Sequence, residues 1–196
     1  MPERLTIARS ELILGGQKSG KSRRAEELAS SWLAQSPHYR AVLIATAQAG
    51  DDEMRERIAR HQQDRAERVP ALLTIEEPLA LAEAIKQHGN RHTLVLVDCL
   101  TLWLTNYLFP NVDFESNRPL AKALPEQAAT ILIAIKNAVG PVIVVSNEIG
   151  LGVIPIGRPT REFVDTLGRL NQDVAQVCER VTLMAAGMSL LLKGQP

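Results

Sequence analysis

The chain has little of what marks several classes of protein. Only two cysteines occur among its 196 residues, Cys99 and Cys178, and no CxxC spacing is present. This excludes a disulfide framework and a zinc knuckle, so we expect two buried thiols in a reducing compartment. Lysine plus arginine and aspartate plus glutamate number 22 each. The basic surplus that nucleic-acid binding normally needs is missing, and we expect no nucleic-acid partner.

Long hydrophobic runs are also missing. The longest mostly apolar stretch, residues 181–192, is too short to cross a bilayer as a helix. Charged residues interrupt the N-terminal segment, which therefore does not resemble a signal peptide. We expect no membrane span and a cytoplasmic protein. With 45% hydrophobic residues the chain can bury one core. We predict a single domain over residues 1–196, with residues 1–10 as a short N-terminal lead.

Short apolar runs rich in β-branched residues predict buried strands. They occur at residues 12–14, 41–45, 72–75, 93–97, 141–145 and 181–185. Segments with helical period lie between them, at residues 25–33, 78–89, 125–139 and 163–177. This alternation predicts an α/β fold with a mostly parallel central sheet and helices on both faces. Ligands of such sheets bind beyond the carboxyl ends of the strands.

The segment GGQKSGKS fits the P-loop pattern GxxxxGK[ST], directly after a predicted strand and before a predicted helix. It predicts a RecA-like P-loop NTPase fold. Its glycines let main-chain N–H groups curl around a phosphate. Lys21 is expected to reach the β- and γ-phosphates, and the Ser22 hydroxyl to bind Mg²⁺. The predicted nucleotide-binding residues here are Gly15, Gly16, Gln17, Lys18, Ser19, Gly20, Lys21 and Ser22.

Asp98 follows the apolar run of residues 93–97, so a strand would deliver its carboxylate to the same edge of the sheet. We expect it to hold the Mg²⁺ as a Walker B residue. The guanine-recognition motif Asn-Lys-x-Asp of switch GTPases is absent from the sequence, which argues against a timing GTPase. These parts predict phosphoryl transfer from ATP or GTP and leave the acceptor open.

A second motif follows the second predicted strand. Residues 46–48 (TAQ) precede a helical segment, residues 51–65, in which Met54 and Ile58 predict a buried stripe. His61 falls at the margin of this stripe. Taken alone, a histidine there is more often a partly packed surface residue than a catalyst.

The sequence resembles the bifunctional adenosylcobinamide kinase / adenosylcobinamide-phosphate guanylyltransferase family from the first strand nearly to the C-terminus. The stretches that carry the resemblance are GGQKSGKSRRAEELA, IATAQAGDDEMRERIARHQQDR, TIEEP, LVLVDCLTLWLTNYL, VSNEIGLGVIP and GRLNQ. The DDEM-to-histidine helix and the NEIGLGVIP loop are far more particular than the P-loop. The chain departs from relatives at Arg60, where they can carry another histidine.

The resemblance implies that His61 is the catalytic histidine that takes GMP from GTP. Lys21 of the P-loop, whose residues 15–22 we call the phosphate cradle, is the other predicted catalytic residue. The resemblance also implies that Thr46, Ala47, Gln48, Asp64, Arg65 and Glu76 bind GTP and that Asp98 serves the metal. Arg65 has the plainest rationale, because a guanidinium can bind phosphate with two hydrogen bonds. Glu76 would accept hydrogen bonds from guanine. The alternative is that Glu76 is a solvent-exposed carboxylate before a helix, with no role in binding. Mg²⁺, GTP and ATP, adenosylcobinamide and its phosphate, and a homo-oligomer such as a trimer are implied likewise.

Two other functions stay open from the residues alone. One is a plain P-loop small-molecule kinase in which His61 is structural. The other is a non-catalytic nucleotide-sensing module that signals through the loop at residues 147–159.

Under the function that the resemblance implies, the corrinoid substrate is bulky. Part of its site is therefore expected outside the P-loop cleft, at the loop of residues 147–159 or the one at residues 110–119.

Overall fold

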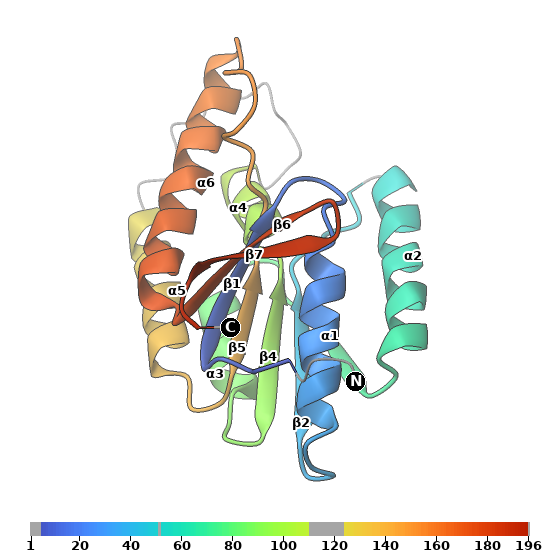
Figure 1. Cartoon of the computed structure of the whole chain (residues 1–196). Coiled ribbons are helices and arrows are strands. Elements are labelled where there is room, and N and C mark those ends of the chain that lie inside the picture. Colours follow the sequence, from blue (N-terminus) through green and yellow to red (C-terminus); the bar gives the residue numbers. More distant parts are fainter. Residues whose placement is uncertain (1–4, 51, 110–123, 196) are drawn as a thin grey trace.

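A parallel sheet with one antiparallel edge strand forms the centre of the molecule (Figure 1). The computed structural model describes residues 5–50, 52–109 and 124–195. In this part of the chain the strands run in the order β3-β2-β4-β5-β1-β6-β7. Their bounds are β1 Ser10–Gly15, β2 Arg40–Ala45, β3 Leu72–Glu76, β4 Thr93–Asp98, β5 Val142–Val145, β6 Arg180–Ala185 and β7 Met188–Lys193. β5 thus separates the P-loop strand β1 from β4, which ends at Asp98.

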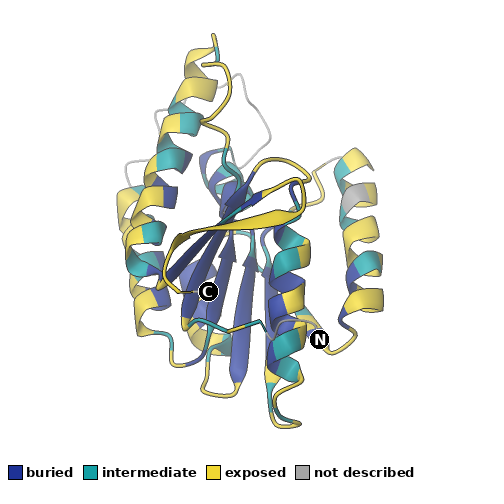
Figure 2. Cartoon of the chain, viewed as in Figure 1, coloured by how far each residue is buried: buried dark blue, intermediate teal, exposed yellow. Residues whose placement is uncertain are grey.

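Helices cover both faces of the sheet, as predicted. They are α1 Lys21–Leu33, α2 Asp52–Arg68, α3 Leu81–His88, α4 Leu100–Leu108, α5 Leu124–Asn137 and α6 Arg158–Val177. Successive strand residues face opposite sides: Leu12 packs with α3 to α6, whereas Ile13 packs with α1. β1, β2, β4, β5 and β6 are mostly buried, whereas only Leu72 of β3 is buried, and β7 and most of α2 are exposed (Figure 2). None of the described helices is long and apolar enough to span a membrane.

The predicted strands are all confirmed, with ends that differ by at most two residues. β7 was not predicted, because its six residues are exposed and do not alternate. α4 was not predicted either, since it has no charged residues to mark a solvent-exposed face and so reveal its period. The predicted loop at residues 147–159 ends two residues early, because Pro159 fits the first turn of α6. The predicted loop at residues 110–119 lies outside the described residues.

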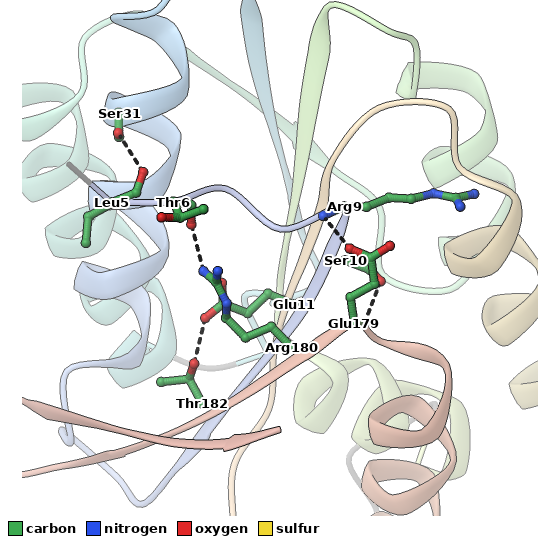
Figure 3. A network of polar contacts seen from close by, with 9 residues as sticks. All are labelled: Leu5, Thr6, Arg9, Ser10, Glu11, Ser31, Glu179, Arg180 and Thr182. Carbon is green, nitrogen blue, oxygen red and sulfur yellow. Dashed lines mark hydrogen bonds and ion pairs between the residues drawn. The ribbon is translucent and has the colours of Figure 1, made fainter. Parts of the chain in front are cut away.

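The N-terminal lead is fastened to the sheet (Figure 3). Arg180 of β6 donates a hydrogen bond to the Thr6 carbonyl oxygen (2.6 Å) and forms an ion pair with Glu11 of β1 (3.4 Å). The Thr182 hydroxyl donates to the same Glu11 carboxylate (2.7 Å). Glu11 and Arg180 are both buried, and a buried charge needs such partners. Thr6, in the described part of the lead, is therefore attached to the sheet.

The strand register brings the predicted site residues to one edge. Ala45 at the end of β2 is opposite both Glu76 of β3 and Asp98 of β4. Asp98 is opposite Val145 of β5, which is in turn opposite Ile13 of β1, two residues before the P-loop. The carboxyl ends of the strands thus form one edge of the sheet, which carries the P-loop, residues 46–48, Glu76 and Asp98. Ligands of parallel sheets bind at this edge.

Candidate active site

The P-loop backbone adopts conformations that require glycine at two positions. Gly15 has φ 153°, and a Cβ there would lie 2.5 Å from the Met184 carbonyl oxygen. Gly20 has φ 104° and is the N-cap residue of α1. A side chain at either position would be strained. The loop therefore presents its main-chain N–H groups at a helix N-terminus, which favours an anion.

Lys21 and Ser22 begin α1 directly beneath this loop. Lys21 is buried, and its ammonium group donates a hydrogen bond to the Gly16 carbonyl oxygen (2.7 Å). The Gly187 N–H, in the turn between β6 and β7, donates to the Ser19 carbonyl oxygen (3.0 Å). The hairpin β6–β7 thus braces the cradle, an interaction that the sequence did not suggest.

Thr46 is completely buried at the end of β2 and fixes the end of β4. Its hydroxyl donates to the Cys99 carbonyl oxygen (2.7 Å) and accepts from the Cys99 N–H (2.9 Å). The Thr46 N–H donates to the Asp98 carbonyl oxygen (3.1 Å), and the Asn106 side chain of α4 donates to the Thr46 carbonyl oxygen (2.7 Å). Thr46 therefore holds Asp98 in position in this structure. Burial raises the pKa of the Cys99 thiol to about 12, and Cys178 is a buried free thiol as well, as predicted.

His61 lies on α2, and its side chain is exposed. The stripe predicted on this helix is only half-buried at Met54 and Ile58, because α2 lies beside α1 at the margin of the molecule (Figure 1). α2 makes its close contacts near its C-terminal end. Arg65, one turn after His61, is buried and donates a hydrogen bond to the Thr74 hydroxyl (3.2 Å), and Val69 just beyond the helix belongs to the α1 core layer.

A charge cluster joins α2 to α1. Glu26 of α1 is buried and forms ion pairs with Arg68 (2.5 Å) and Arg65 (3.8 Å). Burial is the main cause that raises the pKa of Glu26, and the two arginines oppose this shift. Burial likewise lowers the pKa of Arg65, against the opposing charges of Asp98 and Glu26. Glu26 was missed by the sequence analysis, since nothing in the sequence showed that its partners lie 39 and 42 residues away.

The remaining predicted residues lie around this cluster. Asp64 forms an ion pair with Arg68 (3.2 Å), so it supports the same contact. Gln62 donates a long hydrogen bond to the exposed Glu76 (3.5 Å), which connects α2 to the end of β3. Ala47 is half-buried and Gln48 exposed. The fold thus gathers Thr46 to Gln48, Asp98, Arg65 and Glu76 on the β4-β2-β3 side of the P-loop.

The sequence predicts two oxygen donors for a divalent cation, the Ser22 hydroxyl at the start of α1 and the Asp98 carboxylate at the end of β4. Hydroxyl, carboxylate and phosphate oxygens are the ligands that suit Mg²⁺. Within the described residues, no three His, Cys, Asp or Glu side chains form a metal cluster of their own. The donor set therefore fits a cation that also binds nucleotide phosphates.

The sequence matches one family of known proteins over most of its length. A profile of the CobU family, described as cobinamide kinase / cobinamide phosphate guanyltransferase, matches residues 11–192. The bifunctional adenosylcobalamin biosynthesis protein CobP of Pseudomonas aeruginosa is 47% identical over 187 residues, covering 95% of this chain and 98% of that protein. CobU of Escherichia coli, with the same description, is 33% identical over 187 residues, covering 93% and 98%.

Among solved structures, an ATPase from the type III secretion system of pathogenic bacteria is similar with a TM-score of 0.51. The alignment covers 94% of this chain and 57% of that chain at 10% identity. At this identity the likeness concerns the fold alone, and it confirms the predicted P-loop NTPase-like architecture.

Proposed function

The chain belongs to the cobinamide kinase / cobinamide phosphate guanyltransferase family, and from this premise we propose how its residues divide two reactions. As a member of this family it is a transferase with kinase and guanylyltransferase activity. In the proposed sequence, adenosylcobinamide is phosphorylated first, and GMP is then transferred from GTP to the new phosphate through His61.

The first reaction uses the P-loop. A hydroxyl oxygen of adenosylcobinamide attacks the γ-phosphorus of ATP or GTP, the bond to the β–γ bridging oxygen breaks, and the hydroxyl gives up its proton. The nucleoside diphosphate leaves. Residues Gly15 to Ser22 hold the phosphates, and Lys21 neutralises the developing charge. The buried position of Lys21 in the cradle supports this role.

Magnesium would be held by Ser22 and Asp98 together with nucleotide oxygens, and when bound it neutralises phosphate charge. The link between Thr46 and Asp98 supports this assignment, because it fixes the strand end that carries the carboxylate. Thr46 then acts through Asp98, while Ala47 and Gln48 extend from the same strand end toward α2.

The second reaction uses His61. An unprotonated imidazole nitrogen attacks the α-phosphorus of GTP, pyrophosphate leaves, and a phosphorus–nitrogen bond forms. A phosphate oxygen of adenosylcobinamide phosphate then attacks the same phosphorus, the bond to nitrogen breaks, and adenosylcobinamide-GDP is released. Imidazole suits this role because it is largely unprotonated near neutral pH. The proposal is carried by the position of His61. Its side chain is exposed, and it lies one turn before the buried Arg65, which interacts electrostatically with Asp98.

The guanine base would lie toward β3, where Glu76 can accept hydrogen bonds from its N–H groups. Arg65 would contribute positive charge beside the phosphates, and Asp64 would hold Arg68 in the cluster. On family grounds we also propose a homo-oligomer, a trimer being one form.

Labelling with α-³²P GTP tests the transferase half. The wild-type protein should acquire a label that is acid-labile and base-stable, as expected for a phosphoramidate. His61→Asn should acquire none and keep γ-phosphate transfer to cobinamide. His38→Asn, an exposed histidine in a distant loop, serves as the matched control and should label normally. Absence of label from the wild-type protein at saturating magnesium and GTP would reduce the enzyme to a plain P-loop kinase. Tight GTP binding without turnover on added cobinamide would favour a sensing module instead.

A further inference from the structure

A cavity on the other side of the P-loop has no role in the nucleotide contacts described above. The residues proposed for those contacts lie at the ends of β4, β2 and β3, which are on one side of β1 in the sheet. The cavity lies on the other side, between the loop at residues 148–155, the face of α6, and the strands β6 and β7. Its volume is about 930 Å³, near the upper end of the range of roughly 300–1,000 Å³ found for small-molecule sites.

The lining combines an apolar loop with a polar helix face. Leu151, Val153 and Ile154 of the loop are 83, 96 and 77% exposed. Such a concentration of exposed aliphatic side chains usually marks a binding surface. Arg169 and Gln172 of α6 line the opposite wall. The cavity therefore suits a large ligand with apolar faces and polar groups at its periphery.

Asn171, a lining residue of α6, has an unsatisfied polar atom. The side chain is 5% exposed, and its amide nitrogen donates to the Asn147 carbonyl oxygen (3.1 Å). Its amide oxygen has no hydrogen-bond partner among the described residues. A buried acceptor without a partner is costly. Because this oxygen is itself buried, a donor in the cavity would reach it only after neighbouring groups shift.

The cavity adjoins the phosphate cradle. Leu14, the residue before Gly15, lines it. Glu148, another lining residue, donates its N–H to the Gly15 carbonyl oxygen (3.0 Å). A ligand here would reach the P-loop from the side that the nucleotide residues leave open, as an acceptor must in order to meet the phosphorus.

We propose that this cavity binds the corrinoid acceptor, so that nucleotide and corrinoid approach the cradle from opposite sides. The inference rests on the proposed function. A corrinoid presents methyl-bearing faces to Leu151, Val153 and Ile154, and its peripheral carboxamides offer hydrogen bonds to Arg169 and Gln172. The reacting hydroxyl, and later the phosphate, then points toward Gly15.

Gly168→Phe tests the proposal by filling the cavity. Gly168 lines it, and outside its own helix no described atom lies within 4 Å of the position of an added Cβ. We expect the KM for cobinamide to rise at least tenfold, while the KM for the nucleotide and the labelling of His61 by GTP stay unchanged. Asp173→Phe, an exposed position of α6 outside the lining, is the matched control and should change none of these values.

Labelling of His61 separates the two possible failures. Loss of label from every protein, wild type included, would remove the proposed function. Normal label with an unchanged KM for cobinamide in Gly168→Phe would overturn the cavity assignment. A molecular mass of Gly168→Phe that differs from that of the wild-type assembly in sedimentation would overturn it too, by showing that a second copy of the chain occupies the cavity. Val153→Asp, whose side chain is almost fully exposed, gives an independent test should Gly168→Phe not fold. It should weaken cobinamide binding in equilibrium dialysis, and unchanged binding would reject the proposal.

Discussion

Helices α1 and α2 lie side by side, yet they are attached to the molecule in different ways. α1 buries a continuous stripe of Ala25, Leu28, Ala29 and Trp32 against the sheet. α2 has an exposed N-terminal half and is attached near its C-terminal end, through Arg65, Arg68 and Val69. The cradle lysine is thus on a helix fixed by packing, whereas the proposed nucleophile is on a helix fixed mainly by charge.

This difference has a chemical meaning. Apolar packing is insensitive to nearby charge, so α1 keeps the P-loop in one geometry whatever nucleotide is present. Charge pairs respond to any new charge placed beside them. We therefore expect the position of α2 to respond to phosphates bound at the P-loop, because Arg65 also interacts electrostatically with Asp98.

The largest effect that would sharpen this comparison is on stability. Trp32 is buried, stacks on Tyr39 with ring centroids 4.0 Å apart, and donates a hydrogen bond to the Arg40 carbonyl oxygen (3.0 Å). Trp32→Ala should lower the free energy of unfolding by about 3–5 kcal/mol, the usual cost of deleting a buried aromatic side chain. Ile58→Ala on α2 should cost less than about 1 kcal/mol, because Ile58 is only half-buried. Urea unfolding measures both values, and equal losses would contradict the distinction.

A smaller effect is expected from the charge contact itself. Glu26→Gln keeps the shape of the side chain and removes its charge, which weakens its hold on both arginines. The rate of GTP labelling at His61 should fall roughly tenfold, since a charge-assisted hydrogen bond contributes about 1.5 kcal/mol or more. Phosphorylation of cobinamide should be nearly unchanged, because α1 stays packed.

Glu27→Gln is the matched control for that substitution. Glu27 is the next residue of the same helix, but it is exposed and forms an ion pair with Arg23. It should leave both reactions unchanged. Equal losses of labelling and phosphorylation in Glu26→Gln would show that Glu26 serves the cradle and not α2.

The smallest effect is on the pH dependence of stability. Because the folded-state pKa of Glu26 is raised above its ordinary value of 4.5, its contribution to stability is fully present below that pH. It declines as the pH rises through the higher folded-state pKa. Relative to Glu26→Gln, the wild-type protein should therefore lose stability on going from about pH 4 to about pH 8. Urea unfolding of both proteins across this range measures the difference. A relative gain would mean that the arginines outweigh burial.

Most of the fold was predictable because buried parallel strands are recognisable in the sequence as short apolar runs. Leu94 to Val97 illustrates this, with every member buried. β7 escaped prediction because neither of its faces is buried. The P-loop was equally plain from its sequence pattern, and the structure explains the glycines: the φ angles of Gly15 and Gly20 would strain any other residue. The helix that carries His61 was predicted from its Met54 and Ile58 stripe, which is only half-buried. The role of His61 came from the family resemblance alone.

The parts of the site that escaped prediction depend on tertiary neighbours. Glu26 and Glu27 are chemically identical and adjacent, and only the position of Arg65 and Arg68 distinguishes them. Asn171 is one of several polar residues on α6, and its buried, unpaired oxygen is visible only in the folded chain. Sequence patterns indicate which face of an element is buried, but not which distant charge or carbonyl group meets a given side chain.

Thr46 has a consequence for movement. The connection to α2 leaves the sheet at this residue, whose backbone and hydroxyl are bonded to the Asp98–Cys99 turn and whose carbonyl is held by Asn106. If α2 moves, these contacts keep Thr46 and the end of β4 in place. Thr46 would then be a fixed point from which α2 could be repositioned without displacing Asp98.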